Sequence, residues 1–129
     1  MRIFQKISTI TCAVVMSLTT LAVSVSAVNY RYDEDTYVGN KKANAYGFLN
    51  NVRHAYVSTS LYSPDGSAVA TMSYVYLDSK GKTTVVPITG TGYSGVTVDY
   101  ALPSGCTFSI ANTTHSAYGS NIYGGSLYK

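Results

Sequence analysis

A strict two-residue alternation near the C-terminus constrains the fold of this chain more than any other feature. Every second residue of 96–102 is apolar, and the pattern returns in 106–111 after the turn residues Pro103-Ser104-Gly105. Successive side chains of a β-strand point to opposite faces, so the pattern predicts an antiparallel hairpin in which Leu102 opposes Cys106. The expected core face carries Val96, Val98, Tyr100, Leu102, Cys106, Phe108 and Ile110.

A second hairpin is predicted between about His54 and Leu77. Its turn is Ser63-Pro64-Asp65-Gly66, in which each residue type suits one turn position. Pairing Tyr62 with Ala68 gives one aliphatic face and one tyrosine-rich face. We expect the aliphatic face to be the core, because strand faces of Tyr, Ser and Ala are often half exposed. That face carries Val57, Leu61, Val69, Val75 and Leu77.

Further turn signals divide the rest of the chain into short strands. Asp78-Ser79-Lys80-Gly81 leads into a strand over 82–88, which Pro87 marks as an edge strand or a bulge. We expect Gly90, Gly92 and Gly95 to form a loop. No helical period appears after residue 27. The predicted fold class is all-β: a small antiparallel β-sandwich, or partly open barrel, of about six to eight strands.

The first 27 residues have the three parts of a secretory signal peptide. Arg2 and Lys6 form a positive start, residues 7–25 are uncharged and mostly apolar, and Ala27 ends a run of small residues. We expect a signal helix with cleavage after Ala27 and a secreted, extracellular product. The alternative is a membrane anchor, but many Ser and Thr residues dilute the segment. The remainder is predicted as a polar arm (28–43), with a first strand near 36–38 as an alternative, and a β-sandwich domain (44–129).

The charges of residues 28–129 nearly cancel, because two of the nine lysines and arginines of the chain are Arg2 and Lys6. Without a basic stripe we expect no nucleic acid as a partner. We also expect no membrane span after processing and no cofactor. Cys106 is the one cysteine outside the signal segment, so it is expected to be a core residue, with an interchain disulfide as the alternative.

Three groups of residues have the side chains of reactive or metal-binding sites. Cys106, His115 and Asp99 are the types of a thiol catalytic set, but the strand pattern points Cys106 and Asp99 to opposite faces. His54 and His115 lack partners at zinc-ligand spacing. Asp33-Glu34-Asp35 lacks the spaced ligands of a calcium loop, so a solvated segment is expected. We therefore predict no catalytic residue, no metal site and no enzymatic activity.

Tyrosine supplies the best candidate for a binding site. All thirteen tyrosines follow residue 27, and the chain has no tryptophan. In the predicted hairpin, one face carries Tyr56, Tyr62, Tyr74 and Tyr76. Exposed, these rings would stack on sugar rings or pack against a protein partner, because tyrosine offers a large contact area at low entropic cost. Ordinary cross-strand packing is the alternative.

Residues 56–128 resemble a loose group of small exported Gram-positive proteins of unknown role. The likeness is carried by the Ser/Thr/Tyr-rich segment after Tyr56, by Thr114-His115-Ser116-Ala117-Tyr118 and by Tyr123-Gly124-Gly125-Ser126. The size and strand pattern are also similar to lactococcin-type exported bacteriocins, although those are richer in Trp and His. The resemblance transfers no functional residue. The leading expectation is a secreted, non-enzymatic protein that binds cell-wall polysaccharide or a protein partner; the alternative is a bacteriocin-like antimicrobial protein.

Overall fold

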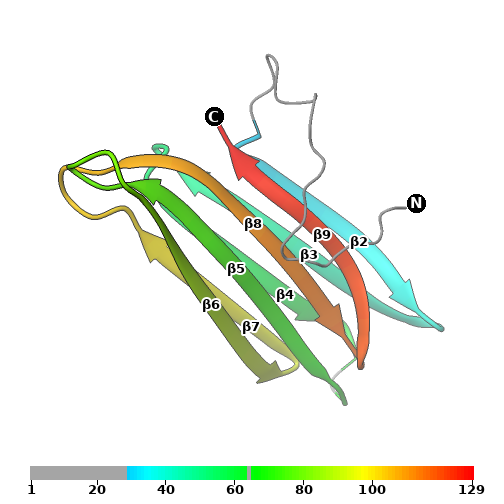
Figure 1. Cartoon of the computed structure of the whole chain (residues 1–129). Helices are drawn as coiled ribbons and strands as arrows, with labels where there is room; N and C mark the ends of the chain where they lie inside the picture. Colours follow the sequence, from blue (N-terminus) through cyan, green and yellow to red (C-terminus); the bar gives the residue numbers. More distant parts are fainter. Residues whose placement is uncertain (1–28, 64) are drawn as a thin grey trace.

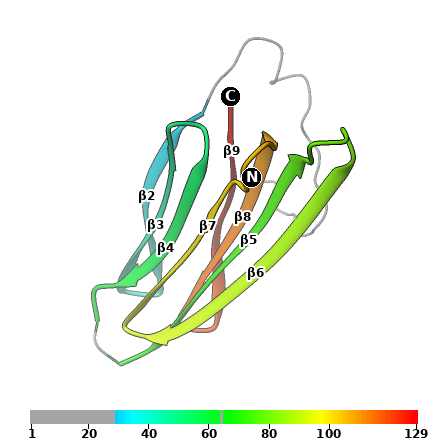
Figure 2. The same cartoon turned by 90° about the vertical axis from the view of Figure 1, so that its left-hand side faces the viewer.

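The computed structural model describes residues 29–63 and 65–129, so the expected signal helix and cleavage site lie outside the described residues. The described residues form eight strands in two antiparallel sheets that lie face to face (Figures 1 and 2). One sheet has the order β2-β3-β4-β7 and the other β6-β5-β8-β9. This confirms the predicted small β-sandwich. The strands are β2 (Arg31–Val38), β3 (Lys41–Asn50), β4 (His54–Leu61), β5 (Ser67–Leu77), β6 (Thr83–Tyr93), β7 (Gly95–Ala101), β8 (Thr107–Ala117) and β9 (Ser120–Tyr128).

Both tightly specified hairpins of the sequence analysis are wrong in their pairing. The expected partners β4 and β5 lie in different sheets, and so do β7 and β8. Instead β4 pairs with β3 and β7, whereas β8 pairs with β5 and β9. Turn residues reverse the chain direction equally well within one sheet or from one sheet to the other, so the turn sequence does not distinguish the two. The hairpin around Asp78-Ser79-Lys80-Gly81 is confirmed as β5–β6, with Leu77 opposite Thr83.

The core lies between the sheets and takes alternate residues from each strand. From β4 it takes Val57, as expected, but from β5 it takes the other face, including Met72 and Tyr74. Of the expected aliphatic residues of β5, Val69 and Val75 are only partly buried and Leu77 is exposed. Because the connection crosses from one sheet to the other, the inward face of β5 is not tied to that of β4. The predicted aliphatic core face is therefore wrong for β5.

A β-bulge changes the inward face of β8. The pairing with β5 shifts between Val75 and Tyr76, which lie opposite Ile110 and Phe108. A bulge adds one residue to a strand, so side chains on its two sides change faces. Phe108 packs against the core, but beyond the bulge the buried residues are Ala111, Thr113, His115 and Ala117. The expected inward position of Ile110 is therefore wrong.

Two segments expected to be irregular are strands. Residues 31–43, expected as a polar arm with a first strand near 36–38 as the alternative, form β2 and the start of β3, which meet at a tight turn where Gly39 adopts a φ of 65°. Residues 90–95, expected as a loop, continue β6 and begin β7. A Cβ atom at Gly90 would lie 2.5 Å from Val98 Cγ1, so glycine here permits the two sheets to approach closely. Pro87 lies in β6, an edge strand of its sheet, as predicted.

Backbone hydrogen bonds also join the two sheets at the edge formed by β2 and β9, opposite the edge formed by β6 and β7. Asn29 and Tyr128 exchange two backbone hydrogen bonds, with N···O distances of 2.7 and 2.9 Å, which ties the start of the described chain to β9. In residues 29–63 and 65–129, no helix has the length and apolar character needed to cross a membrane.

Candidate functional site: the outer face of sheet β2-β3-β4-β7

The four tyrosines proposed as one platform lie in two different places. Tyr56 belongs to β4 and Tyr62 directly follows it, and both lie on the outer face of sheet β2-β3-β4-β7. Tyr74 is fully buried between the sheets, and Tyr76 is partly buried against the same core. The Tyr74 ring packs 4.8 Å from that of Tyr100, and its hydroxyl donates to the Arg53 carbonyl. The structure therefore does not assemble the four-tyrosine platform.

Cys106, His115 and Asp99 are not brought together either. Asp99 lies on the outer face of β7, where its carboxylate contacts His54 Nε2 at 2.8 Å. His115 is buried between the sheets. Cys106 precedes β8 and is half buried rather than hidden in the core; its Sγ lies 3.8 Å from the Ser104 carbonyl. Residue types that suggest thiol chemistry are thus separated in space.

His115 is instead part of a buried chain of hydrogen bonds between the two sheets. Thr59 Oγ1 donates to the Val69 carbonyl at 2.9 Å, so its oxygen accepts from His115 Nδ1 at 2.8 Å. The other ring nitrogen, Nε2, is then the acceptor for the Tyr32 hydroxyl at 2.7 Å. Thr113 Oγ1 lies 2.6 Å from the same hydroxyl. With the imidazole neutral, the Tyr32 hydroxyl donates to Nε2 and its oxygen accepts from Thr113, whose Oγ1 also lies 3.2 Å from the Gly125 carbonyl.

Burial lowers the pKa of one group in this network and raises the pKa of another. Desolvation lowers the pKa of His115 to about 3, because a buried imidazolium loses its hydration. Desolvation also raises the pKa of the Tyr32 hydroxyl, with a smaller opposing effect from Thr113. Both shifts favour the uncharged forms, so the network is a neutral structural element rather than an acid–base pair.

We expect Tyr32→Phe to destabilise the protein by about 2 kcal/mol. The substitution removes the hydroxyl that donates to His115 Nε2 and leaves this buried nitrogen without a partner. Chemical denaturation of both proteins measures the difference. Tyr37→Phe is the matched control, since Tyr37 is 66% exposed and its hydroxyl has no role in the core. Equal destabilisation by both substitutions would contradict the assigned role of the network.

The outer face of sheet β2-β3-β4-β7 carries an aromatic cluster, defined here as Tyr46, Phe48, His54 and Tyr56. Phe48 and Tyr56 occupy opposing positions on β3 and β4. Their rings are nearly parallel, with centroids 6.4 Å apart and an interplanar angle of 23°. The His54 and Tyr56 rings are stacked at 4.2 Å and 20°. Each of the four residues is partly exposed, so the cluster offers aromatic surface to solvent.

Polar groups surround this aromatic cluster on the same face. The Arg31 guanidinium lies over the Tyr46 ring, 5.3 Å from its centroid, and contacts Asp33 at 3.5 Å. On the opposite side, Asp99 is paired with Tyr56 across the β4–β7 ladder and contacts His54. Partly exposed rings next to hydrogen-bonding side chains are the usual elements of a binding surface for a partly apolar ligand.

The acidic segment Asp33-Glu34-Asp35 is part of β2, whose alternation places Asp33 and Asp35 on the outer face and Glu34 on the opposite face. Asn44 Nδ2 donates to Asp33 at 2.7 Å and to Asp35 at 2.9 Å. Lys42 Nζ contacts Asp35 at 3.2 Å. The hydrogen bond from Asn44, followed by that from Lys42, lowers the pKa of Asp35. No group of three or more potential metal ligands is found in the part of the chain that the structure describes.

The predicted platform contained Tyr56 and Tyr62. His54 and Asp99 were considered only as members of the rejected metal and thiol sets, and Tyr46 and Phe48 were missed. These two rings belong to 41–50, a segment in which Ala43, Ala45, Gly47 and Leu49 alternate with larger or polar residues. That alternation was a usable signal for a strand. It would have placed Tyr46 and Phe48 on one face, although not beside Tyr56.

Comparison with known proteins adds no relative: no protein-family model matches this chain, and no curated protein matches it.

Proposed function

We propose that this protein is an exported, non-enzymatic binding protein that holds an extracellular polysaccharide on the outer face of sheet β2-β3-β4-β7. The observation that carries the proposal is the aromatic cluster, in which Phe48, Tyr56 and His54 present nearly parallel rings beside polar side chains. The expected signal peptide of residues 1–27 supports a location outside the cell.

The chemistry of a sugar ring matches this surface. A pyranose ring has apolar C–H faces that pack on aromatic rings, and a rim of hydroxyls that need hydrogen-bond partners. At the cluster, His54 bonds one oxygen of Asp99 at 2.8 Å and the Tyr56 hydroxyl at 3.1 Å, which leaves the second Asp99 oxygen and further capacity on the Tyr56 hydroxyl for a ligand. A rigid β-sheet holds these groups in place, so little side-chain entropy is lost when a ligand binds.

A binding assay with a single ring variant tests the proposal. The chain from residue 28 onward is incubated with insoluble cellulose, chitin, xylan, mannan and purified bacterial wall polysaccharide, and bound protein is quantified. We expect retention by at least one of these polysaccharides. Tyr56→Ala should lower the affinity about tenfold or more, because a central aromatic side chain contributes on the order of 2 kcal/mol to binding.

Tyr93→Ala is the control, because Tyr93 is 72% exposed but belongs to β6 of the other sheet. It should bind as the unaltered protein does, and circular dichroism should show that both variants keep the strand structure. Absence of binding to every polysaccharide, or equal binding by Tyr56→Ala and the unaltered protein, would overturn the proposal.

A further inference from the structure

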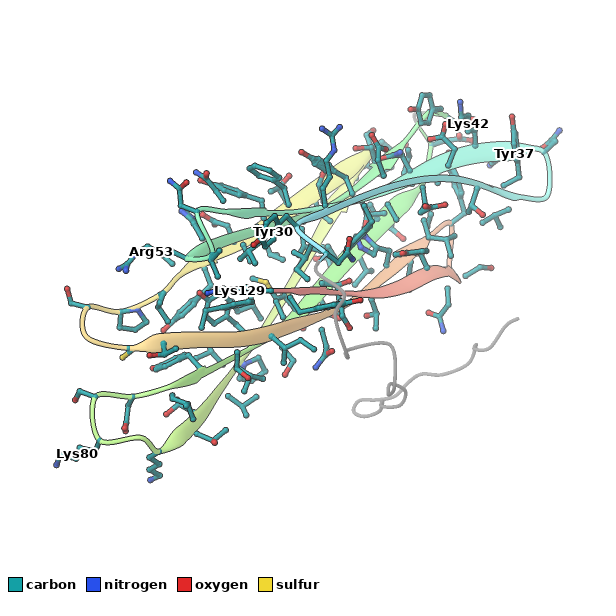
Figure 3. The ribbon with its side chains drawn as sticks, turned by 90° about the horizontal axis from the view of Figure 1, so that it is seen from above. Tyr30, Tyr37, Lys42, Arg53, Lys80 and Lys129 are labelled. Carbon is teal, nitrogen blue, oxygen red and sulfur yellow. The ribbon has the colours of Figure 1, made fainter. Side chains whose placement is uncertain are left out.

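We infer that the site extends along the whole length of β4 and takes an extended, uncharged glycan chain, an inference that rests on the proposed function. The far cluster, defined here as Tyr37, Lys42 and Tyr62, lies at the other end of the same outer face. Tyr37 and Lys42 are opposite each other on β2 and β3, and rise together at one end of the molecule in Figure 3. Lys42 Nζ lies 4.8 Å from the centroid of the Tyr62 ring.

The far cluster is well exposed to solvent. Tyr37 is 66% exposed and Tyr62 is 60% exposed. The Tyr62 backbone is nevertheless fixed, since its N–H donates to the Lys42 carbonyl at 3.1 Å. An exposed ring on a fixed backbone is suited to stacking on a ligand, because few degrees of freedom are lost on binding.

Small hydroxyl-bearing residues connect the two clusters along β4. Ser58 and Ser60 lie between Tyr56 and Tyr62 at alternate positions, so all four side chains share the outer face. On the neighbouring strand, Gly95 pairs with Ser60 and Thr97 pairs with Ser58. Thr97 Oγ1 donates to Ser58 Oγ at 3.2 Å. Along β4 and β7 the two aromatic clusters are thus separated by small side chains that offer hydroxyl groups. On β3, Tyr46 of the aromatic cluster lies opposite Ser58, and Asn44 lies opposite Ser60.

The spacing of the two clusters sets the length of the ligand. Tyr56 and Tyr62 are six residues apart on an extended strand, which corresponds to about 20 Å. A disaccharide is too short to contact both rings, whereas a longer chain in an extended conformation contacts both and covers the serines between them. We therefore expect affinity to rise with chain length until both clusters are occupied.

The charges on this face favour a ligand without charge. Arg31 is paired with Asp33, Lys42 with Asp35, and His54 with Asp99. An anionic chain finds no unpaired cation among the outward side chains of these strands, and would meet three carboxylates. Arg53 lies at the end of the sandwich, away from this face, where it donates to the Leu102 carbonyl.

Oligosaccharide ladders test the inference. The di-, tetra- and hexasaccharides of the neutral polysaccharide that binds best are titrated by calorimetry. Tyr62→Ala should lower the affinity for the hexasaccharide about tenfold and leave the disaccharide unaffected. Tyr62→Phe should keep the affinity, because the stacking surface remains. Tyr56→Ala should weaken both ligands, and Tyr93→Ala neither. Binding should change little with salt, since no net charge is neutralised.

The outcomes separate the inference from the proposed function. If Tyr56→Ala weakens binding but Tyr62→Ala leaves the hexasaccharide affinity unchanged, the extended site is wrong and the aromatic cluster alone binds. If only anionic chains such as polygalacturonate or alginate bind, and salt abolishes that binding, the uncharged ligand is wrong. If no polysaccharide of either kind binds, the proposed function fails as well.

Discussion

Acidification from neutral pH to about pH 3.5 is expected to remove about 4 kcal/mol of folding free energy through the single residue His115. Its imidazole is neutral in the folded protein, since burial lowers its pKa from 6.5 to about 3. In the unfolded chain the same group takes up a proton near pH 6.5. Below that pH the unfolded state binds more protons than the folded state, so stability falls as the pH falls.

The loss has a defined pH window. It is absent above about pH 7, reaches about 2.7 kcal/mol near pH 4.5, and is complete only below the folded-state pKa near 3. Protonation would also place a hydrogen on Nε2, which accepts the Tyr32 hydroxyl, so the buried hydrogen bonds would have to rearrange. A domain of this size has a total stability of about 5–15 kcal/mol, so the expected loss is a large fraction of it.

Denaturant unfolding at a series of pH values measures this effect. In His115→Gln, which cannot take up a proton, the slope between pH 6.5 and pH 3 should flatten. His54→Gln is the matched control, because His54 lies on the surface beside Asp99 and its loss should leave the slope in place. Independently, NMR titration of the unaltered protein should show His115 neutral down to about pH 4. A His115 resonance that titrates near pH 6.5 would contradict the assignment.

The part of the fold that follows from local sequence was predictable. Alternation at 96–102 correctly identified a strand, β7, in which Val98 is buried; Leu102, which directly follows the strand, is buried as well. Asp78-Ser79-Lys80-Gly81 correctly identified a hairpin, because the Asp78 carboxylate accepts hydrogen bonds from the backbone of Lys80 and Lys82. These features depend on neighbours within a few residues, which the sequence displays directly.

The pairing of strands was not predictable in the same way. The turns after β4 and β7 carry the chain between the sheets, and their residues suit a hairpin equally well. The bulge near Ile110 places His115 in the core, and no residue type in β8 is a sequence signal for a bulge. Whether a strand pairs with its neighbour in sequence is decided by packing between distant segments, such as the hydrogen bond from Tyr32 to His115.

The candidate site was predictable only in its residue types. Tyrosine abundance indicated a binding surface, and Tyr56 and Tyr62 do lie on an outer face. The incorrect hairpin added Tyr74, which is a core residue, and Tyr76, which packs against the core, and it omitted Phe48, which comes from β3. A surface assembled from three strands requires the correct pairing, so the error in topology became an error in the site.

Gly47→Ala is expected to destabilise the protein by roughly 3–5 kcal/mol, more than most single-methyl additions. Gly47 lies opposite Tyr32 on the inward face of β3. An added Cβ would stand 2.3 Å from Tyr32 Cε1 and 2.4 Å from Cζ, distances that no real Cβ contact tolerates. The ring would have to move, yet its hydroxyl is held by His115 and Thr113. The substitution thus combines overpacking with the loss of buried hydrogen bonds.

A double-mutant cycle shows whether this clash is the cause. Tyr32→Leu removes the ring atoms nearest the new methyl group, so Gly47→Ala should cost much less in that background than alone. Gly124→Ala is the matched control in another strand, because its Cβ would meet only the Thr113 carbonyl oxygen at 3.8 Å, an ordinary contact. It should leave stability nearly unchanged. If Gly47→Ala lowers the free energy of unfolding equally with Tyr or Leu at position 32, the clash with the Tyr32 ring is not the cause of the destabilisation.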